Sequence, residues 1–334
     1  MAPRAAIEIE NLKKSFRVRK ARGTSVVQRL ASLIAGEVES VVAVDGVSFA
    51  VEAGERVAFI GPNGAGKSTT LKILSGILQP DSGRAEVLGL VPWEARAELG
   101  FRAGTVFGQR SQLWYDLPPA DTFALLARVY ELPDAEYRAR FDALVTAFEL
   151  APLLEKPVKS LSLGERMRCE IAASLLHKPS ILFLDEPTIG LDVSAKAVIR
   201  DLLLRRSADD AATLLLTSHD TGDIEHVCDR VIVIHGGRIL LDGPVAALRQ
   251  TLTTKRLTLL TDSERIALDL PGLELVAAEA HRATYSVDTA KTPLGTVVEA
   301  AVRQGGLRDL SIEDPPLDVV IRSLYERADG SRAA

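Results

Sequence analysis

The stretch Gly61-Pro62-Asn63-Gly64-Ala65-Gly66-Lys67-Ser68 decides the fold, because it matches the phosphate-binding pattern GxxxxGK[ST] in full. It follows the apolar residues 56–60 and precedes a helix-compatible segment, 69–75. This is the strand–loop–helix setting that the pattern requires. Glycines let the backbone turn tightly, so that its N–H groups face phosphate oxygens near the positive end of a helix. The Lys67 ammonium would meet the β- and γ-phosphates, and the Ser68 hydroxyl would coordinate Mg²⁺.

A second group of candidate residues lies at the end of another apolar run. Residues 181–184 are apolar, and Asp185 and Glu186 follow them directly. If this run is a strand beside the one that precedes the loop, both carboxylates reach the sheet edge where ligands bind. Asp185 would hold Mg²⁺, directly or through water, and Glu186 would be the general base for the water that attacks the γ-phosphate. A strand that merely ends in an acidic turn is the alternative.

A short motif, Leu161-Ser162-Leu163-Gly164-Glu165, lies about 20 residues before Asp185 and opens a helical segment. Ser162 and Gly164 stand where a hydroxyl and helix N-terminal amides could bind a phosphate.

Together these motifs resemble the ATP-binding cassette (ABC) family over about residues 5–245. The resemblance implies an α/β fold of the P-loop NTPase type, with a mainly parallel core sheet, an antiparallel β subdomain and an inserted helical subdomain at about 110–176. It implies ATP and Mg²⁺ as cofactors, and a head-to-tail dimer in which Ser162 and Gly164 contact the γ-phosphate held by the other subunit. Leu163 and Glu165 depart from the usual LSGGQ, where glycine and glutamine stand.

The resemblance also assigns roles to residues that no local pattern would single out. His219 resembles the switch histidine, residues 187–192 resemble the D-loop with Asp192 as its acid, and Gln109 would reach Mg²⁺ and the attacking water. Gln112 competes with Gln109 for that role. Phe16 would stack on adenine, or would simply be a core residue. The nucleotide-binding candidates are Phe16, Gly61, Pro62, Asn63, Gly64, Ala65, Gly66, Lys67, Ser68, Thr69, Ser162, Gly164 and Asp192. The metal candidates are Ser68, Gln109 and Asp185, and the catalytic candidates are Glu186, His219 and Gln109.

Composition limits the classes of protein that the chain can form. With 334 residues, 47% hydrophobic and 25% charged, it is long enough for about two ordinary globular domains. A net charge of −5 disfavours general nucleic-acid binding. Only two cysteines occur, Cys169 and Cys228, which excludes a cysteine-based zinc ribbon and fits a reducing cytoplasm. No apolar run reaches 18 residues, and Glu8 and Glu10 interrupt the only candidate signal peptide.

Strands and helices alternate after residue 176, which favours an α/β core. We expect an ATP-binding domain at 1–248 and a small α+β accessory domain at 249–334. The basic segment 11–22 is typical of a solvated loop, with contact to acidic lipid headgroups or a partner as the alternative, and 26–34 is compatible with a short amphipathic helix.

Three stretches point to a branch of the family. Residues 161–168, 108–114 and 311–316 resemble bacterial drug- and viologen-exporter ATPases, whose permeases are separate polypeptides. The resemblance implies a second cassette, a permease and a position on the cytoplasmic face of the inner membrane. The aromatic cluster at 112–118 would face the permease, or would be buried in the helical subdomain. The competing functions are a soluble ABC ATPase that acts on ribosomes or DNA, a P-loop small-molecule kinase and a non-hydrolysing module.

Overall fold

The computed structural model describes residues 5–19, 38–108, 111–210, 212–248, 254–262 and 268–333. The chain divides into two compact units, Met1–Gly243 and Pro244–Ala334. Gln109 and the expected helix at 26–34 lie outside the described residues. Within the described ranges, no helix is both long and apolar enough to cross a membrane.

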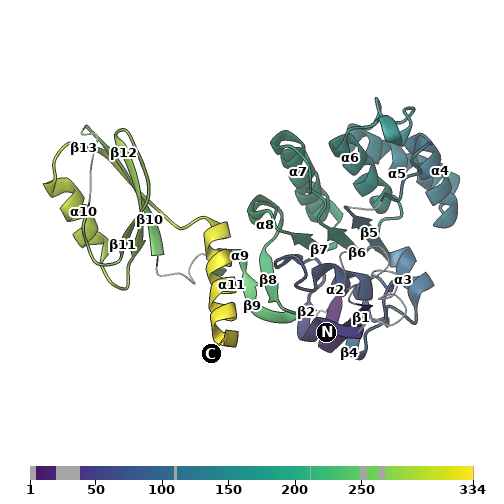
Figure 1. Cartoon of the computed structure of the whole chain (residues 1–334). Coiled ribbons are helices and arrows are strands. Elements are labelled where there is room, and N and C mark those ends of the chain that lie inside the picture. Colours follow the sequence, from purple (N-terminus) through teal and green to yellow (C-terminus); the bar gives the residue numbers. More distant parts are fainter. Residues whose placement is uncertain are drawn as a thin grey trace, which may run out of the picture. The chain divides into compact units, whose positions relative to one another are not determined.

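A six-stranded sheet forms the centre of the first unit, in the order β5-β6-β7-β3-β8-β9 (Figure 1). The pairs from β5 to β8 are all parallel. Their residues are almost entirely apolar and buried, as expected for strands with helices over both faces. The strands are β3 (Arg56–Ile60), β5 (Ala103–Phe107), β6 (Ile181–Asp185), β7 (Thr213–Ser218), β8 (Arg230–His235) and β9 (Arg238–Pro244). The predicted mainly parallel α/β core is therefore confirmed.

Helices connect these strands and form the inserted subdomain, with α4, α5 and α6 grouped at one end of the unit in Figure 1. Pro119 opens α4, where its fixed φ and missing N–H cost nothing. Helices α4, α5 and α6 form the inserted helical subdomain that the resemblance implies. The helices are α2 (Lys67–Leu74), α3 (Arg96–Arg102), α4 (Pro119–Val129), α5 (Asp134–Ala147), α6 (Leu163–Leu175), α7 (Val193–Asp210) and α8 (Thr221–Val227), with a 3₁₀ turn at Val158–Ser160.

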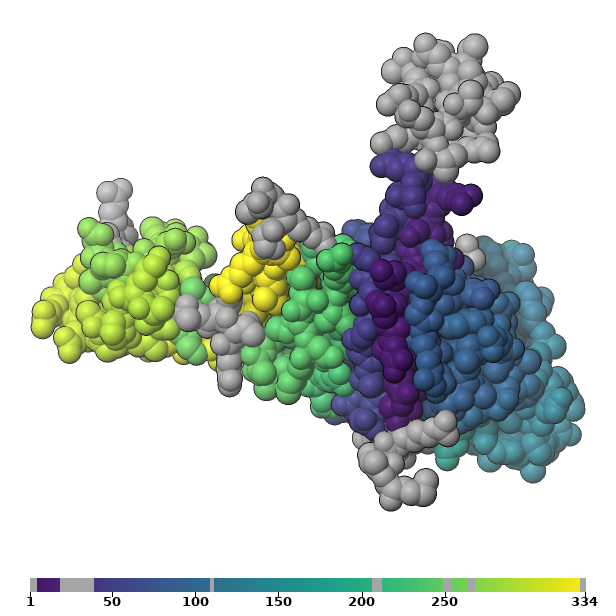
Figure 2. All heavy atoms as spheres, turned by 90° about the horizontal axis from the view of Figure 1, so that it is seen from below, coloured from purple at the N-terminus to yellow at the C-terminus, as the bar shows by residue number. Residues whose placement is uncertain are grey.

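A three-stranded antiparallel sheet, β2-β1-β4, covers the core. Its strands are β1 (Ile7–Arg19), β2 (Val38–Val51) and β4 (Ser82–Val87), and Figure 2 shows the purple β1 between its two neighbours on the surface of the unit. The expected basic loop is wrong for residues 11–19, which continue β1 and pair with β2 up to Arg19↔Val38. Pairing to β2 satisfies this backbone while the side chains of Lys13, Lys14 and Arg17 remain exposed or half-exposed, so their charge is compatible with a strand.

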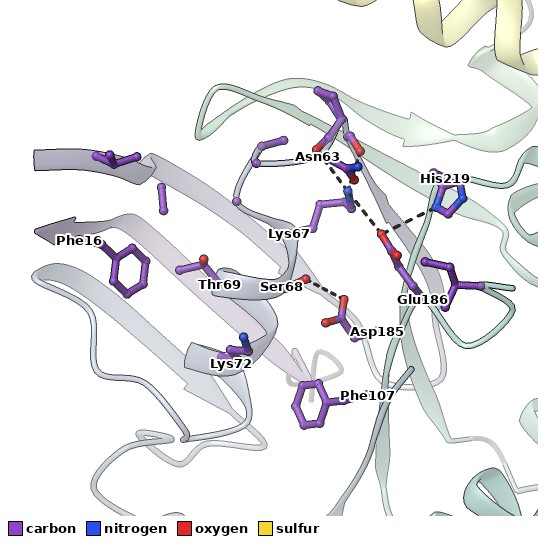
Figure 3. A pocket seen from close by; sticks show the side chains of 18 of the residues that line it. Phe16, Asn63, Lys67, Ser68, Thr69, Lys72, Phe107, Asp185, Glu186 and His219 are labelled. Atoms are coloured by element: carbon purple, nitrogen blue, oxygen red, sulfur yellow. Dashed lines mark hydrogen bonds and ion pairs between the residues drawn. The ribbon is translucent and has the colours of Figure 1, made fainter. Parts of the chain in front are cut away.

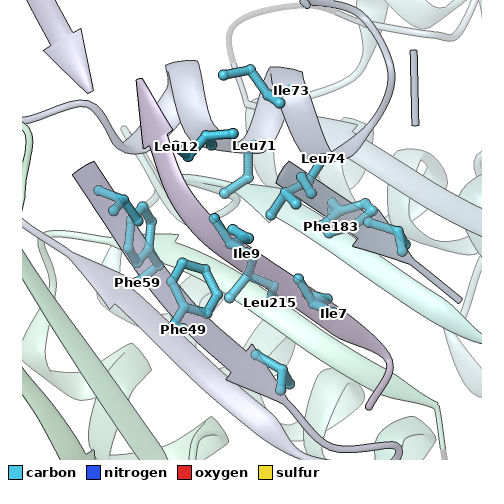
Figure 4. Packing of buried hydrophobic residues seen from close by; sticks show 14 of the residues in the cluster. Ile7, Ile9, Leu12, Phe49, Phe59, Leu71, Ile73, Leu74, Phe183 and Leu215 are labelled. Atoms are coloured by element: carbon cyan, nitrogen blue, oxygen red, sulfur yellow. The ribbon is translucent and has the colours of Figure 1, made fainter. Parts of the chain in front are cut away.

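One hydrophobic cluster joins the two sheets of the first unit. Ile7, Ile9 and Leu12 of β1 pack with Leu71 of α2 and Phe183 of β6 (Figure 4). All are nearly or fully buried. This packing fixes α2, and therefore the loop before it, against the strand that carries Asp185.

The second unit has its own antiparallel sheet, β11-β12-β10-β13. Val297 and Ala301 of α10 pack on Leu257 and Leu259 of β10, as part of a core separate from that of the first unit. The elements are α9 (Val245–Leu248), β10 (Thr254–Thr261), β11 (Leu273–Glu279), β12 (Arg282–Asp288), α10 (Leu294–Arg303), β13 (Leu307–Glu313) and α11 (Leu317–Ala333). These elements form the small α+β unit that the sequence predicts.

Candidate functional site

The loop between β3 and α2 has a conformation that depends on glycine. Gly66 has a φ of 108°, and a Cβ at this position would lie 2.3 Å from the carbonyl oxygen of Ala43 in β2. L side chains rarely adopt this backbone conformation, and no side chain fits the space. The loop therefore closes tightly against β2, and α2 begins directly after it with Lys67 and Ser68 in its first turn.

Lys67 lies in the interior of this loop. Its Nζ donates to the carbonyl oxygens of Gly61 (2.7 Å) and Pro62 (3.3 Å) and lies 3.8 Å from Oε1 of Glu186. Burial lowers the pKa of Lys67, and the nearby carboxylates of Glu186 and Asp185 oppose that shift. A buried ammonium that is held by neutral carbonyls can bind an anion at little additional desolvation cost.

Asp185 and Ser68 place two hard oxygen atoms together. Ser68 Oγ donates to Asp185 Oδ1 at 3.1 Å, and Thr217 Oγ1 donates to the same atom at 2.6 Å. Hydroxyl and carboxylate oxygens are the ligands that Mg²⁺ prefers, usually with several waters and phosphate oxygens completing the shell. These residues therefore fit a magnesium site beside the loop.

Glu186 is held by its backbone. Its φ of 53° lies in the left-handed region, which is uncommon for a residue other than glycine and is frequent at functional sites. Its N–H donates to the carbonyl oxygen (3.1 Å) and to Oγ1 (3.0 Å) of Thr217. Its Oε1 lies 3.8 Å from Nδ1 of His219. The carboxylate thus stands between the Lys67 ammonium and the imidazole.

Lys67, Ser68, Asp185, Glu186 and His219 line one cavity of about 890 Å³ (Figure 3). Phe16 lies at one end and the Glu186–His219 pair at the other, with α2 between them. Lys14 places its Nζ 5.8 Å from the centre of the Phe16 ring, a cation–π contact. The lining includes these expected residues: Phe16, Gly61, Pro62, Asn63, Gly64, Ala65, Gly66, Lys67, Ser68, Thr69, Asp185, Glu186 and His219.

Other expected residues lie outside the cavity. Ser162 caps α6, where its Oγ accepts from the N–H of Glu165 (3.2 Å) and its own N–H donates to Glu165 Oε2 (2.8 Å). The hydrogen bond from the Ser162 N–H lowers the pKa of Glu165. Asp192 caps α7 by accepting from the N–H of Ala195 at 2.9 Å. Gly164 follows Ser162 in the first turn of α6.

The first turn of α6 packs on the segment that follows Glu186. A Cβ on Gly190 would lie 3.1 Å from Leu163 Cδ2, and a Cβ on Gly164 would lie 3.0 Å from that of Ala195. Leu163, which stands where the usual motif has glycine, thus packs beside Gly190 of the same chain.

Gln112, the alternative to Gln109 for contact with Mg²⁺ and the attacking water, makes a different contact in the structure. Gln112 Nε2 donates to the carbonyl oxygen of Glu170 in α6 at 2.9 Å, and Gln112 is not among the residues that line the cavity. The neighbouring aromatic side chains are exposed: Trp114 is 45% and Tyr115 58% accessible. Burial in the helical subdomain is therefore wrong for these two residues.

The sequence reasoning missed Thr217, which bridges Asp185 and Glu186. A threonine near the end of an apolar strand is an ordinary strand residue. The one feature of the sequence that could have pointed to Thr217 is its position just before Ser218 and His219. Thr217 itself does not line the cavity, but six residues that do were not among the site candidates: Val41, Ala43, Lys72, Ile77, Phe107 and Ile189.

The parallel sheet, the glycine loop at the start of α2 and the carboxylates at the end of β6 define a P-loop nucleotide-binding protein. Comparison with known proteins narrows this class. The profile of the family described as "ABC transporter" matches residues 44–189. The chain is 32% identical over 288 residues to the daunorubicin resistance ATP-binding protein DrrA3 of Streptomyces coeruleorubidus, covering 84% of this chain and 90% of that protein.

Two further similarities agree. The ABC transporter ATP-binding protein NatA of Bacillus subtilis is 32% identical over 63% of this chain and 85% of its own length. A solved structure titled as the ATP-binding subunit of an ABC transporter superposes with a TM-score of 0.60 and 26% identity, over 74% of this chain and 92% of that one. The chain therefore belongs to the ABC transporter family, as an ATP-binding and ATP-hydrolysing subunit.

Proposed function

We propose that this chain powers an export-type ABC transporter, and that its residues carry out ATP hydrolysis in the following way. The observation that carries the proposal is the convergence of Lys67, Ser68, Asp185, Glu186 and His219 on one cavity. A phosphate clamp, a pair of metal-binding oxygens and a base lie within reach of one triphosphate. Positioning and electrostatic stabilisation of this kind account for phosphoryl transfer without a covalent intermediate.

Ser68 and Asp185 would hold Mg²⁺, which supplies charge neutralisation to the β- and γ-phosphates when it is bound. Lys67 exchanges its carbonyl partners for phosphate oxygens. Glu186 accepts a proton from the attacking water, and His219, 3.8 Å away, contacts the γ-phosphate and orients that carboxylate. Phe16 stacks on adenine at the other end of the cavity.

A second cassette completes the site in this proposal. Ser162 and Gly164 of one subunit bind the γ-phosphate held by the other. The Ser162 Oγ accepts from the Glu165 N–H, so its hydroxyl proton is free to be donated to a phosphate. Val193, beside Asp192, is 84% exposed, which supports an interface for the segment after Glu186. Hydrolysis removes the contacts that join the two subunits, and they separate.

The membrane subunit is a separate permease in this proposal, which places the chain on the cytoplasmic face of the inner membrane. The support is the naming of the relatives: one is a daunorubicin resistance protein, and others are Nod factor export proteins. Exposed Trp114 and Tyr115 supply the large amphipathic side chains that are typical of interface centres.

The test compares Glu186→Gln with Glu136→Gln, an exposed position on α5. We expect Glu186→Gln to bind Mg-ATP with unchanged affinity, to accumulate as an ATP-bound dimer in light scattering, and to lose roughly 100-fold or more of its turnover. Glu136→Gln should match the wild type. Unchanged turnover of pure Glu186→Gln protein would contradict the base assignment.

The trapped Glu186→Gln dimer also tests the partner. After Mg-ATP trapping in detergent-solubilised native membranes, one or two co-purifying proteins with several membrane spans support the transporter proposal. Ribosomal or DNA-associated proteins without a permease would overturn it in favour of a soluble ABC ATPase.

A further inference from the structure

A buried carboxylate that does not line the cavity joins the two segments that carry Glu186 and His219. Asp223, in α8, is 1% exposed. Its Oδ2 accepts hydrogen bonds from the hydroxyls of Thr188 and Ser218 (2.7 Å for Ser218). Each donor is close to a residue of the site in sequence, since Thr188 follows Glu186 by two positions and Ser218 directly precedes His219.

Arg200 of α7 supplies the opposite charge. Its Nε donates to Asp223 Oδ1 at 2.7 Å, and its Nη2 donates to Asp220 Oδ1 at 2.8 Å. Lys196, one turn earlier on the same helix, donates to the other oxygen of Asp220 at 2.6 Å. Burial opposes ionisation of Asp220, but these cationic partners and the Gly222 N–H lower its pKa overall.

The backbone on both sides of the imidazole is therefore fixed. Ser218 Oγ also accepts from the N–H of Asp220 at 2.9 Å, so the residues before and after His219 are joined to each other as well as to α7 and α8. The His219 side chain is 59% exposed. Packing therefore contributes little to its direction, and the backbone at 218 and 220 sets where the ring points.

Gly222 lies directly against the guanidinium of Arg200. A Cβ at this position would lie 2.7 Å from the Arg200 guanidinium. A side chain at position 222 would therefore displace the guanidinium from the hydrogen bonds that it donates to Asp220 and Asp223.

We propose that Asp223 is a positioning residue, with Arg200 as its counter-ion, which sets the separation of Glu186 and His219 through Thr188 and Ser218. Asp223, Arg200 and Thr188 are not among the residues that line the cavity, so they act through the residues that do. The inference rests on the proposed function of Glu186 and His219. If these hydrogen bonds served only the stability of the fold, they would still hold α7 and α8 in place. Removal of a single hydroxyl from the network would then leave the rate of catalysis unchanged.

The experiment removes one hydroxyl without changing shape. Thr188→Val keeps the branched side chain and loses the hydrogen bond to Asp223, whereas Thr188→Ser keeps the hydroxyl. Asp223→Asn is compared with Asp229→Asn, because Asp229 also bonds an arginine, Arg56, through two 2.8 Å contacts, and like Asp223 it does not line the cavity. All are full-length chains, assayed in the membrane complex for kcat and for the Kd of a fluorescent ATP analogue.

We expect Thr188→Val and Asp223→Asn to lower kcat by roughly tenfold to 100-fold, because displacements of about 1 Å at a reacting group have effects of this size. The Kd should stay within about twofold, since the loop and Phe16 are untouched. Thr188→Ser should recover most of the lost kcat, and Asp229→Asn should behave as the wild type.

The experiment distinguishes failure of the positioning role from failure of the proposed function. If Thr188→Val hydrolyses ATP at the wild-type rate, or if kcat and Kd change together with thermal stability, the positioning role is wrong while the proposed function stands. If the wild-type complex does not hydrolyse ATP, or if Lys67→Ala binds the analogue as the wild type does, the proposed function fails and the inference falls with it.

Discussion

Ser68 Oγ and Asp185 Oδ1 lie 3.1 Å apart although 117 positions separate the two residues in the sequence. The first is in the opening turn of α2 and the second ends β6. Packing of α2 against β6 in the shared hydrophobic cluster brings them together, so the candidate metal site depends on the core as well as on two motifs.

This contact leads to a prediction about magnesium. Asp185→Asn removes the negative charge that Mg²⁺ requires and should abolish the Mg²⁺-dependent part of ATP affinity, with turnover reduced by roughly 100-fold or more. Titration of a fluorescent ATP analogue with and without Mg²⁺ measures this, with Asp229→Asn as the matched control. Equal Mg²⁺ dependence in Asp185→Asn and the control would remove Asp185 from the metal site.

A second prediction concerns the loop. Gly66→Ala would place a methyl group 2.3 Å from Ala43 O at a φ of 108°, so we expect nucleotide affinity to fall by about tenfold or more, with some loss of stability. Gly100→Ala, in α3, meets nothing within 4 Å and should be neutral or stabilising by about 0.5–1 kcal/mol. Isothermal titration with ATP and urea unfolding distinguish the two, and tight binding by Gly66→Ala would show that the loop can adopt another conformation.

A third prediction concerns pH. His177 is buried and stacks on Tyr130 with ring centres 3.8 Å apart, and burial lowers its pKa from 6.5 to about 4. Because the unfolded chain binds the proton more readily between these two values, stability rises with pH there. When the pH is lowered from about 7 to about 5, protonation of His177 in the unfolded chain should therefore reduce the free energy of unfolding by about 2 kcal/mol.

The His177→Phe variant keeps a ring against Tyr130 but cannot be protonated. Urea unfolding at both pH values should show that this contribution has disappeared, whatever the absolute stability of the variant. Tyr130→Phe keeps the stack and the histidine, so its pH dependence should equal that of the wild type. A pH dependence in His177→Phe as steep as in the wild type would mean that other groups cause it.

The parts of the fold that the sequence predicts well are those where one signal dominates. The loop at 61–68 carries a motif, and the uninterrupted apolar run 181–184 lies within the buried strand β6. The antiparallel sheet β2-β1-β4 gives no such signal. Residues 11–19 form a strand because β2 lies beside them, and β4, with the sequence SGRAEV, has few apolar residues to mark it.

The candidate site divides in the same way. The sequence predicts the site residues that belong to a recognisable motif, and most of these residues line the cavity. Thr217 and Asp223 were not found, because a buried threonine and a buried aspartate have meaning only through their partners, and those partners are distant in the sequence. Three-dimensional proximity of this kind leaves no trace in residue spacing.

The packing of Leu163 beside Gly190 has a consequence for a pair of cassettes. In the proposed dimer, the first turn of α6 serves the nucleotide of the other subunit, while Gly190 follows the Glu186 that acts on the subunit's own nucleotide. One close contact inside a single chain therefore lies between two reaction centres. In that dimer, loss of phosphate from one centre would displace atoms that lie close to the other, so we expect the two centres to be mechanically coupled rather than independent.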